Sequence, residues 1–123
     1  MCLTYKIKGS FMQQSIQQLI ANAIADHKKY DEDIKEFDYN CTVESTHYEV
    51  QTNTAIRELY QDKNRCPKEI NLDICAYQEQ LNDRKKAARS KWDYLIEETK
   101  QKQIKSQELY AQQILELVKK ESK

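Results

Sequence analysis

NRCPKEINLDIC, residues 64–75, contains the only proline of the chain, and two cysteines flank it. Cys66 directly precedes Pro67, and Cys75 follows Cys66 by nine positions. Because the residue before a proline is disfavoured in the helical region of backbone space, a helix that reaches this stretch must end near Cys66. Asn71 and Asp73 are residue types that favour turns and helix caps. We therefore expect a bent segment that joins two helices.

Amphipathic patterns lie on both sides of this segment. Before it, Thr46 and Glu49 have the spacing of a capping box, which predicts a helix over about 44–63. After it, apolar residues recur at helical spacing and predict a helix over about 73–120. One seam of the later helix contains Ile74, Tyr77, Leu81, Ala88, Trp92 and Leu95. A second apolar patch near its end, typical of a docking site, contains Ile104, Ala111, Ile114, Leu115 and Val118.

Another amphipathic pattern precedes these two. Ser10 and Gln13 form a capping-box spacing and predict a first helix over about 11–38. Apolar side chains follow in alternating steps of four and three, the pattern of a seam between helices. The seam consists of Ile16, Ile20, Ala23, His27, Tyr30, Ile34 and Phe37, and the opposite face is acidic through Asp31, Glu32, Asp33, Glu36 and Asp38. We expect a short break at 39–43.

The composition favours an all-α fold. One glycine and one proline in 123 residues are too few for a sheet protein, which needs a turn about every 8–12 residues. The prediction is a single helical subunit, residues 1–123, with three long amphipathic helices: an antiparallel hairpin and an extended N-terminal helix. Charged residues make up 33% and hydrophobic residues 39% of the chain, which predicts a thin core and a component of an assembly.

Charge and hydropathy exclude several classes of function. Lys and Arg together number 20, as do Asp and Glu, so the basic excess of a nucleic-acid-binding protein is missing. No run approaches the 18 apolar residues of a membrane span, and the N-terminus has no secretory-signal pattern. One basic cluster contains Arg84, Lys85, Lys86, Arg89 and Lys91. It is interpreted as a solvated face or as a partner of the acidic Asp31–Asp38 face, with RNA contact as a further alternative.

The cysteines and histidines leave few chemical roles. If residues 66–75 bend, Cys66 and Cys75 form a disulfide that stabilises the hairpin by about 2–3 kcal/mol; two free thiols are the alternative. Neither this pair nor His27 and His47 has the close spacing of a structural zinc site, so we expect no metal and no cofactor. No arrangement of a nucleophile, a base and an orienting group is evident, so we expect no enzymatic activity.

Two segments resemble a known family. LYQDKNRC at 59–66 and CAYQEQL at 75–81 resemble the cysteine-bearing helical hairpin of the PDSW-type accessory subunits of mitochondrial complex I. They are more loosely similar to intermembrane-space proteins with paired Cys-x9-Cys helices. The spacing here is Cys-x8-Cys and no second pair exists, so only Cys66 and Cys75 are carried over. The resemblance implies a disulfide-locked, non-catalytic subunit at the intermembrane-space side of the mitochondrial inner membrane.

The expected function is therefore structural. The chain would scaffold neighbouring subunits of a large membrane complex, with respiratory complex I preferred, and would lie at the membrane without spanning it. A soluble coiled-coil-like interaction protein of a cytoskeletal or ciliary assembly is the alternative, located in the cytoplasm. In both cases the expected partners are proteins and not nucleic acid. The predicted partner-binding seam consists of Ile16, Ile20, Tyr30, Ile34, Phe37, Trp92, Ile114 and Val118.

Overall fold

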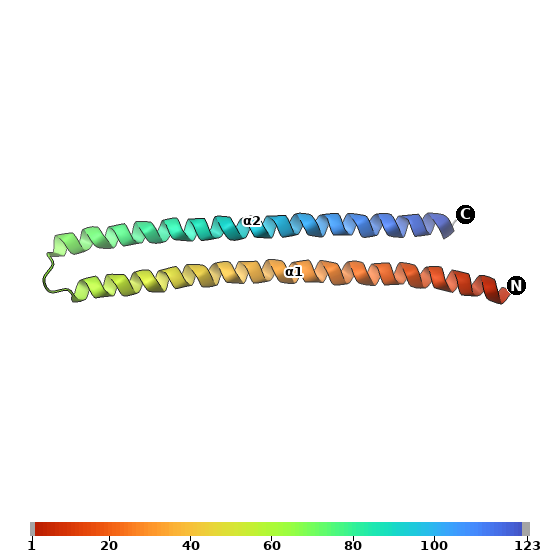
Figure 1. Ribbon diagram of the computed structural model, residues 1–123, viewed down its shortest axis with the longest axis horizontal. Coiled ribbons are helices and arrows are strands. Elements are labelled where there is room, and N and C mark those ends of the chain that lie inside the picture. Colours follow the sequence, from red (N-terminus) through yellow and green to blue (C-terminus); the bar gives the residue numbers. More distant parts are fainter. Residues whose placement is uncertain (1, 122–123) are drawn as a thin grey trace. The chain divides into compact units, whose positions relative to one another are not determined.

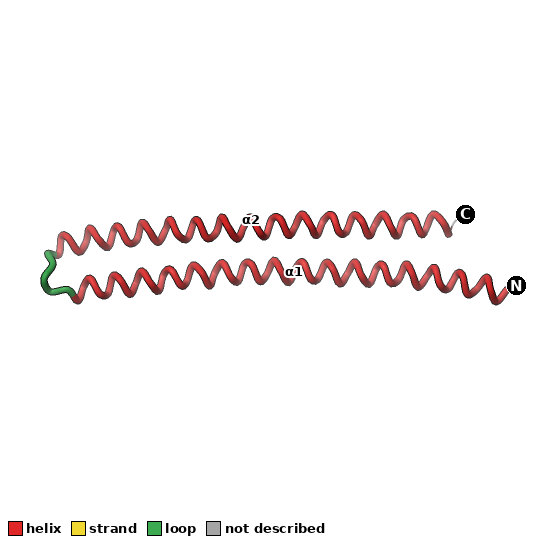
Figure 2. Tube along the Cα trace, in the orientation of Figure 1, coloured by secondary structure: helices red, strands yellow, loops and turns green. Residues whose placement is uncertain are grey.

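Two α-helices make up almost all of the described chain. The computed structural model describes the backbone of residues 2–121 and the side chains of residues 15–121. Helix α1 covers Cys2–Gln61 and helix α2 covers Pro67–Glu121 (Figure 1). Between residues 2 and 121 the structure contains no strand, and one loop joins the helices (Figure 2). The all-α prediction is confirmed, but the prediction of three helices is wrong.

Helix α1 runs without interruption through the break expected at 39–43. This stretch contains neither glycine nor proline, and its β-branched and polar residues lower helix propensity by only a few tenths of a kcal/mol each. The Thr42 hydroxyl donates to the carbonyl oxygen of Asp38, four positions earlier, at 3.2 Å, so this polar side chain has its hydrogen-bond partner within the helix. Cys41, in the middle of the stretch, is buried. Helix α1 also starts at Cys2, well before the cap expected at Ser10.

The turn lies where the sequence placed it, but helix α2 begins earlier than expected. Pro67 occupies the first position of α2, where its missing N–H and fixed backbone angle are tolerated. The amide of Ile70 donates to the carbonyl oxygen of Cys66 at 3.1 Å and closes the first helical turn. On the other side, the amide of Asn64 donates to Oδ1 of Asp62 at 3.0 Å. Residues 67–73, expected to bend, are therefore helical.

The packing of the two helices divides the chain into two compact units. One unit, Lys35–Ile96, is an antiparallel hairpin made from the end of α1, the turn and the start of α2. The other unit pairs the part of α1 before Lys35 with the part of α2 from Glu97 onward. The predicted hairpin is thus present in the first of these units, and the N-terminal helix packs against the last part of α2.

Few side chains are fully enclosed. Among the residues whose side chains are described, the buried hydrophobic ones are Cys41, Ile70, Ala88 and Ile96, and the buried polar ones are Thr52 and Thr99. Two of the four hydrophobic side chains are small, so the helices approach each other with little apolar volume between them. Within the described part of the chain, neither helix has a segment apolar enough to cross a bilayer.

Candidate interaction site

Helices α1 and α2 of the hairpin unit meet through an aromatic pair and a shared carboxylate. The rings of Phe37 and Trp92 lie with their centroids 6.0 Å apart. Two helical turns further along α1, Glu44 accepts a hydrogen bond from the indole N–H of Trp92 at 2.6 Å. Both Phe37 and Trp92 belong to the predicted seam. Trp92 thus packs its ring against Phe37 and donates a part-buried hydrogen bond through its N–H, as tryptophan commonly does at interfaces.

Three donor groups surround the carboxylate of Glu44. Besides Trp92, the Tyr48 hydroxyl donates to Oε1 at 2.8 Å, and Lys91 lies 3.1 Å from Oε2. These groups hold the pKa of Glu44 at about 2, below its ordinary 4.5, with the Trp92 hydrogen bond as the largest cause. The same contact, viewed from the phenol, raises the pKa of Tyr48. Glu44 is therefore an ionised acceptor that connects the two helices.

Four of the five residues of the basic cluster contact side chains of α1 within the hairpin unit. Arg89 pairs with Asp38 of α1 and with Asp93 of its own helix, and these carboxylates raise its pKa. Lys85 pairs with Glu49, and Lys91 pairs with Glu44. The guanidinium carbon of Arg84 lies 5.7 Å from the centroid of the Tyr48 ring, within cation–π range. The predicted contact with the acidic Asp31–Asp38 face is formed at one member, Asp38.

The predicted disulfide between Cys66 and Cys75 is wrong. Cys66, Cys75 and Cys41 are free thiols; the first two are exposed and Cys41 is buried. Because Cys66 directly precedes α2 and Cys75 lies inside it, nine helical rises of 1.5 Å separate them by about 13 Å. A disulfide needs Cα atoms within about 7 Å. Cys41 instead faces α2, where Nη1 of Arg89 lies 3.4 Å from its sulfur.

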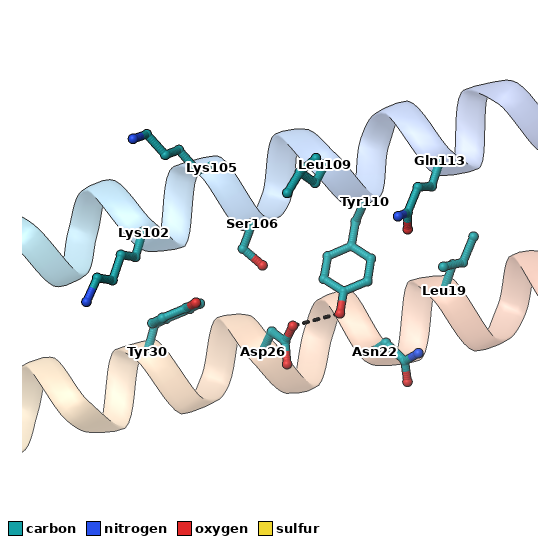
Figure 3. A pocket seen from close by; sticks show the side chains of 10 residues that line it. All are labelled: Leu19, Asn22, Asp26, Tyr30, Lys102, Lys105, Ser106, Leu109, Tyr110 and Gln113. Atoms are coloured by element: carbon teal, nitrogen blue, oxygen red, sulfur yellow. Dashed lines mark hydrogen bonds between the residues drawn. The ribbon is translucent and has the colours of Figure 1, made fainter.

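The other unit contains an open groove of about 580 Å³ between its two helix segments (Figure 3). Tyr110 reaches from α2 toward α1 and donates to Oδ2 of Asp26 at 2.7 Å, which raises the pKa of Tyr110. Leu19 and Tyr30 line the groove on the α1 side. On the α2 side, Lys102 extends toward α1 whereas Lys105 points outward (Figure 3). Tyr30, a predicted seam residue, is thus half-buried at the groove.

In the unit that contains the groove, a second polar contact joins α2 to α1. Nε2 of Gln103 donates to the carbonyl oxygen of His27 at 3.1 Å and to Oδ1 of Asp31 at 2.9 Å. The side-chain amide nitrogens of Gln103 and Gln107 both lie within hydrogen-bond distance of Nδ1 of His27. With Nδ1 as acceptor, Nε2 carries the proton and faces Asp31 at 3.4 Å. His27 is therefore a structural hydrogen-bonding residue in this unit.

His27 and Gln107 mark a side of this unit that exposes apolar residues. On α1, Ile20 and Ile24 precede His27 by seven and three positions, and are 44% and 65% exposed. Residues three, four, seven, eight or eleven positions apart share one face of a helix. On α2 the exposed apolar residues at such spacings from Gln107 are Ile104, Ala111, Leu115 and Val118. We call these six residues the apolar flank.

The predicted partner-binding seam divides between the chain's own interface and this flank. Six of its eight members, Ile16, Tyr30, Ile34, Phe37, Trp92 and Ile114, are half-buried. Ile20 and Val118 remain exposed and belong to the apolar flank. The C-terminal patch expected to dock a partner likewise stays exposed at Ile104, Leu115 and Val118.

No local sequence pattern predicts the polar contacts between the two helices. Glu44 and its partner Trp92 are 48 positions apart, and Asp26 and Tyr110 are 84 apart, so no local spacing connects them. One signal was present: Glu44 lies between Cys41 and Tyr48 in the continuing seam pattern.

Among the described residues, no three histidines, cysteines, aspartates or glutamates come together in a way that could hold a metal ion. The chain matches no family model, and no curated protein or solved structure is detectably similar to it.

Proposed function

We propose that this chain is a non-catalytic interaction protein, a coiled-coil-like helical scaffold that binds neighbouring protein chains through its apolar flank. The observation that carries the proposal is the flank itself: six apolar residues at helical spacing, contributed by both α1 and α2, all exposed. An amphipathic helix could pack its apolar stripe against this exposed face. A partner helix laid along the flank would cover Ile24 and Leu115 together.

The thin core supports the same function. The helices bury four hydrophobic side chains, whereas twelve large ones among the described residues are exposed, from Ile20 at 44% to Tyr94 at 70%. Long helices owe most of their stability to tertiary packing rather than to intrinsic propensity. Additional burial against a partner would therefore stabilise a chain whose own interface is largely polar. The proposed mechanism is assembly through helix packing. In the unit that carries the flank, the cross-helix hydrogen bonds of Gln103 with Asp31 and of Tyr110 with Asp26 fix which faces remain available.

Two settings for this scaffold are distinguishable. An accessory subunit of mitochondrial complex I, on the intermembrane-space side of the inner membrane, is supported by the resemblance around Cys66 and Cys75. The disulfide is no longer part of that proposal. A coiled-coil-like protein of a cytoskeletal or ciliary assembly in the cytoplasm is supported by two exposed free thiols, which persist in a reducing compartment. The free thiols favour the second setting.

The test compares two leucine substitutions on the same helix. Leu115 lies on the apolar flank and Leu109 lies on the groove side of α2; they are 52% and 59% exposed. In native extracts, the full chain is expected to elute within an assembly much larger than its 14.7 kDa. Leu115→Glu should release it, because an unpaired carboxylate cannot be buried against a partner. Leu109→Glu should leave the assembly intact.

Two results would overturn the proposal: a chain that elutes alone in native extracts, or a Leu115→Glu chain that stays in the assembly. Circular dichroism of both variants checks that their helices persist. Cell fractionation of the same extracts then separates the settings. Recovery with inner-membrane complexes supports the respiratory setting, and recovery with cytoplasmic filaments supports the cytoskeletal one.

A further inference from the structure

The outer side of α1 in the hairpin unit carries a second apolar surface. Tyr39 and Val43 lie two positions before and two after the buried Cys41, and Val50 lies two before the buried Thr52. A displacement of two residues turns a side chain by about 200° around the helix, so these three point away from α2. Thr46 lies midway between Glu44 and Tyr48, which both face α2, and is also exposed. We call Tyr39, Val43, Thr46 and Val50 the outer stripe.

The outer stripe has the spacing of a coiled-coil seam. Its steps are four, three and four, the alternation in which one helix packs its side chains between those of another. Val43 and Val50 are 48% and 58% exposed, and Tyr39 is 69% exposed. The stripe is therefore a complete set of helix-packing positions on a surface that α2 does not cover.

Opposite charges lie at the two ends of the outer stripe. Continuing the same steps, Glu36 precedes Tyr39 by three positions, and Asn53 and Arg57 follow Val50 by three and seven. Glu36 and Arg57 are both exposed, and neither forms an ion pair with the described residues. The face thus has an acidic end, an apolar centre and a basic end.

This order of charges is self-complementary in one orientation. If a second stripe packs antiparallel, with the two-fold axis between residues 44 and 45, Tyr39 lies opposite Val50 of the other copy and Val43 opposite Thr46. Glu36 then lies opposite Asn53 of the other copy and within one helical turn of its Arg57, at both ends of the pair. A parallel pair would place glutamate on glutamate and arginine on arginine, which is unfavourable.

We infer that the outer stripe is a homodimer interface, at which two copies of this chain pack their α1 helices antiparallel. An isologous contact of this kind uses the same patch on both subunits and closes on itself. The inference rests on the proposed scaffold function and names one of its partners, a second copy. It concerns the hairpin unit, whereas the apolar flank belongs to the other unit, so the two surfaces can be tested separately.

The primary test measures the mass of the full chain in solution. Sedimentation equilibrium across a concentration series should give twice 14.7 kDa for the native sequence. Val50→Glu should raise the dimer dissociation constant at least about tenfold, since each dimer would bury two unpaired carboxylates. Val118→Glu is the matched control, because it makes the same change at an exposed valine of the apolar flank. It should leave the dimer unchanged.

A charge exchange tests the orientation. Glu36→Arg and Arg57→Glu should each weaken the dimer by placing like charges at both ends, and the doubly exchanged chain should recover the native dissociation constant. A monomer at every concentration, a dimer lost with Val118→Glu but kept with Val50→Glu, or singles that do not differ from the double would each overturn the inference. Binding of partners through Leu115 would survive the first of these results, so the scaffold function would stand without the dimer.

Discussion

The indole N–H of Trp92 donates a hydrogen bond to Oε2 of Glu44, with 2.6 Å between the nitrogen and the oxygen. The bond links α2 to α1 across an interface in which few apolar side chains are buried. Lys91 adds a second cross-helix donor, and Tyr48 adds one from α1 itself. Because all three donors favour the ionised carboxylate, the contact depends on the charge of a single side chain.

Acid should weaken the hairpin unit through Glu44. Its pKa is lowered to about 2 from an ordinary 4.5, so its contribution to the free energy of unfolding is fully present above about pH 4.5. That contribution is lost as the pH falls from about 4.5 through about 2. The measurement is the thermal midpoint by circular dichroism over this range. Glu44→Gln should lower the midpoint at neutral pH and flatten its acid dependence.

Glu58→Gln is the control for the acid experiment, because Glu58 is an exposed glutamate of the same helix. It should keep the acid dependence of the native chain. Equal acid dependence in the native and Glu44→Gln chains would show that the carboxylate does not link the helices.

Alkali should weaken both units through tyrosine. Tyr48 donates to Glu44 and Tyr110 donates to Asp26, and these bonds raise both pKa values above 10.0. A raised pKa means that the stabilising contribution is fully present below about pH 10 and is lost as the pH rises through the folded-state value. Titration of phenolate absorbance should therefore show a late phase. Tyr48→Phe and Tyr110→Phe should each reduce that phase, and an unchanged late phase in both would contradict the assignment.

A buried and an exposed isoleucine of α2 should separate folding from binding. Ile96 is 9% exposed and Ile104 is 48% exposed. Ile96→Ala should lower the free energy of unfolding by about 2–4 kcal/mol through lost packing and a residual cavity. Ile104→Ala should lower it by less than about 0.5 kcal/mol, as an exposed substitution does. Chemical denaturation of the two full-length variants measures both values, and equal losses would contradict the burial of Ile96.

The sequence was sufficient for the helical class and for the turn, because both depend on local chemistry. A chain with one glycine and one proline has few places to turn, and Pro67 marks the place used. The prediction of a break at 39–43 was wrong because it, too, relied on local signals. Capping-box spacings such as Thr46 with Glu49 are local signals that also occur inside helices, and here the seam continues past them through Cys41 and Glu44.

The site was less accessible to sequence reasoning because its contacts are long-range. Heptad spacing placed Phe37 and Trp92 each on the seam of its own helix, since periodicity defines faces. It could not pair Glu44 with Trp92, because that pairing depends on the register of α1 against α2. The exposed flank shows the same limit: periodicity grouped Leu115 with Val118, but only the packed helices show that Ile114 turns inward from that patch.

The three described cysteines should differ in reactivity. Cys66 and Cys75 are exposed and should be alkylated rapidly in the native protein. Cys41 is 4% exposed and lies beside Arg89, so its labelling requires local opening of the structure. It should react at least about tenfold more slowly than the other two. Peptide mass spectrometry of a Cys2→Ser chain after timed alkylation measures the three rates. Mild oxidation should join Cys66 or Cys75 to other chains, since a bridge between them requires the first turns of α2 to unwind. An intramolecular Cys66–Cys75 bridge formed without loss of helical circular dichroism would contradict the continuous helix from Pro67.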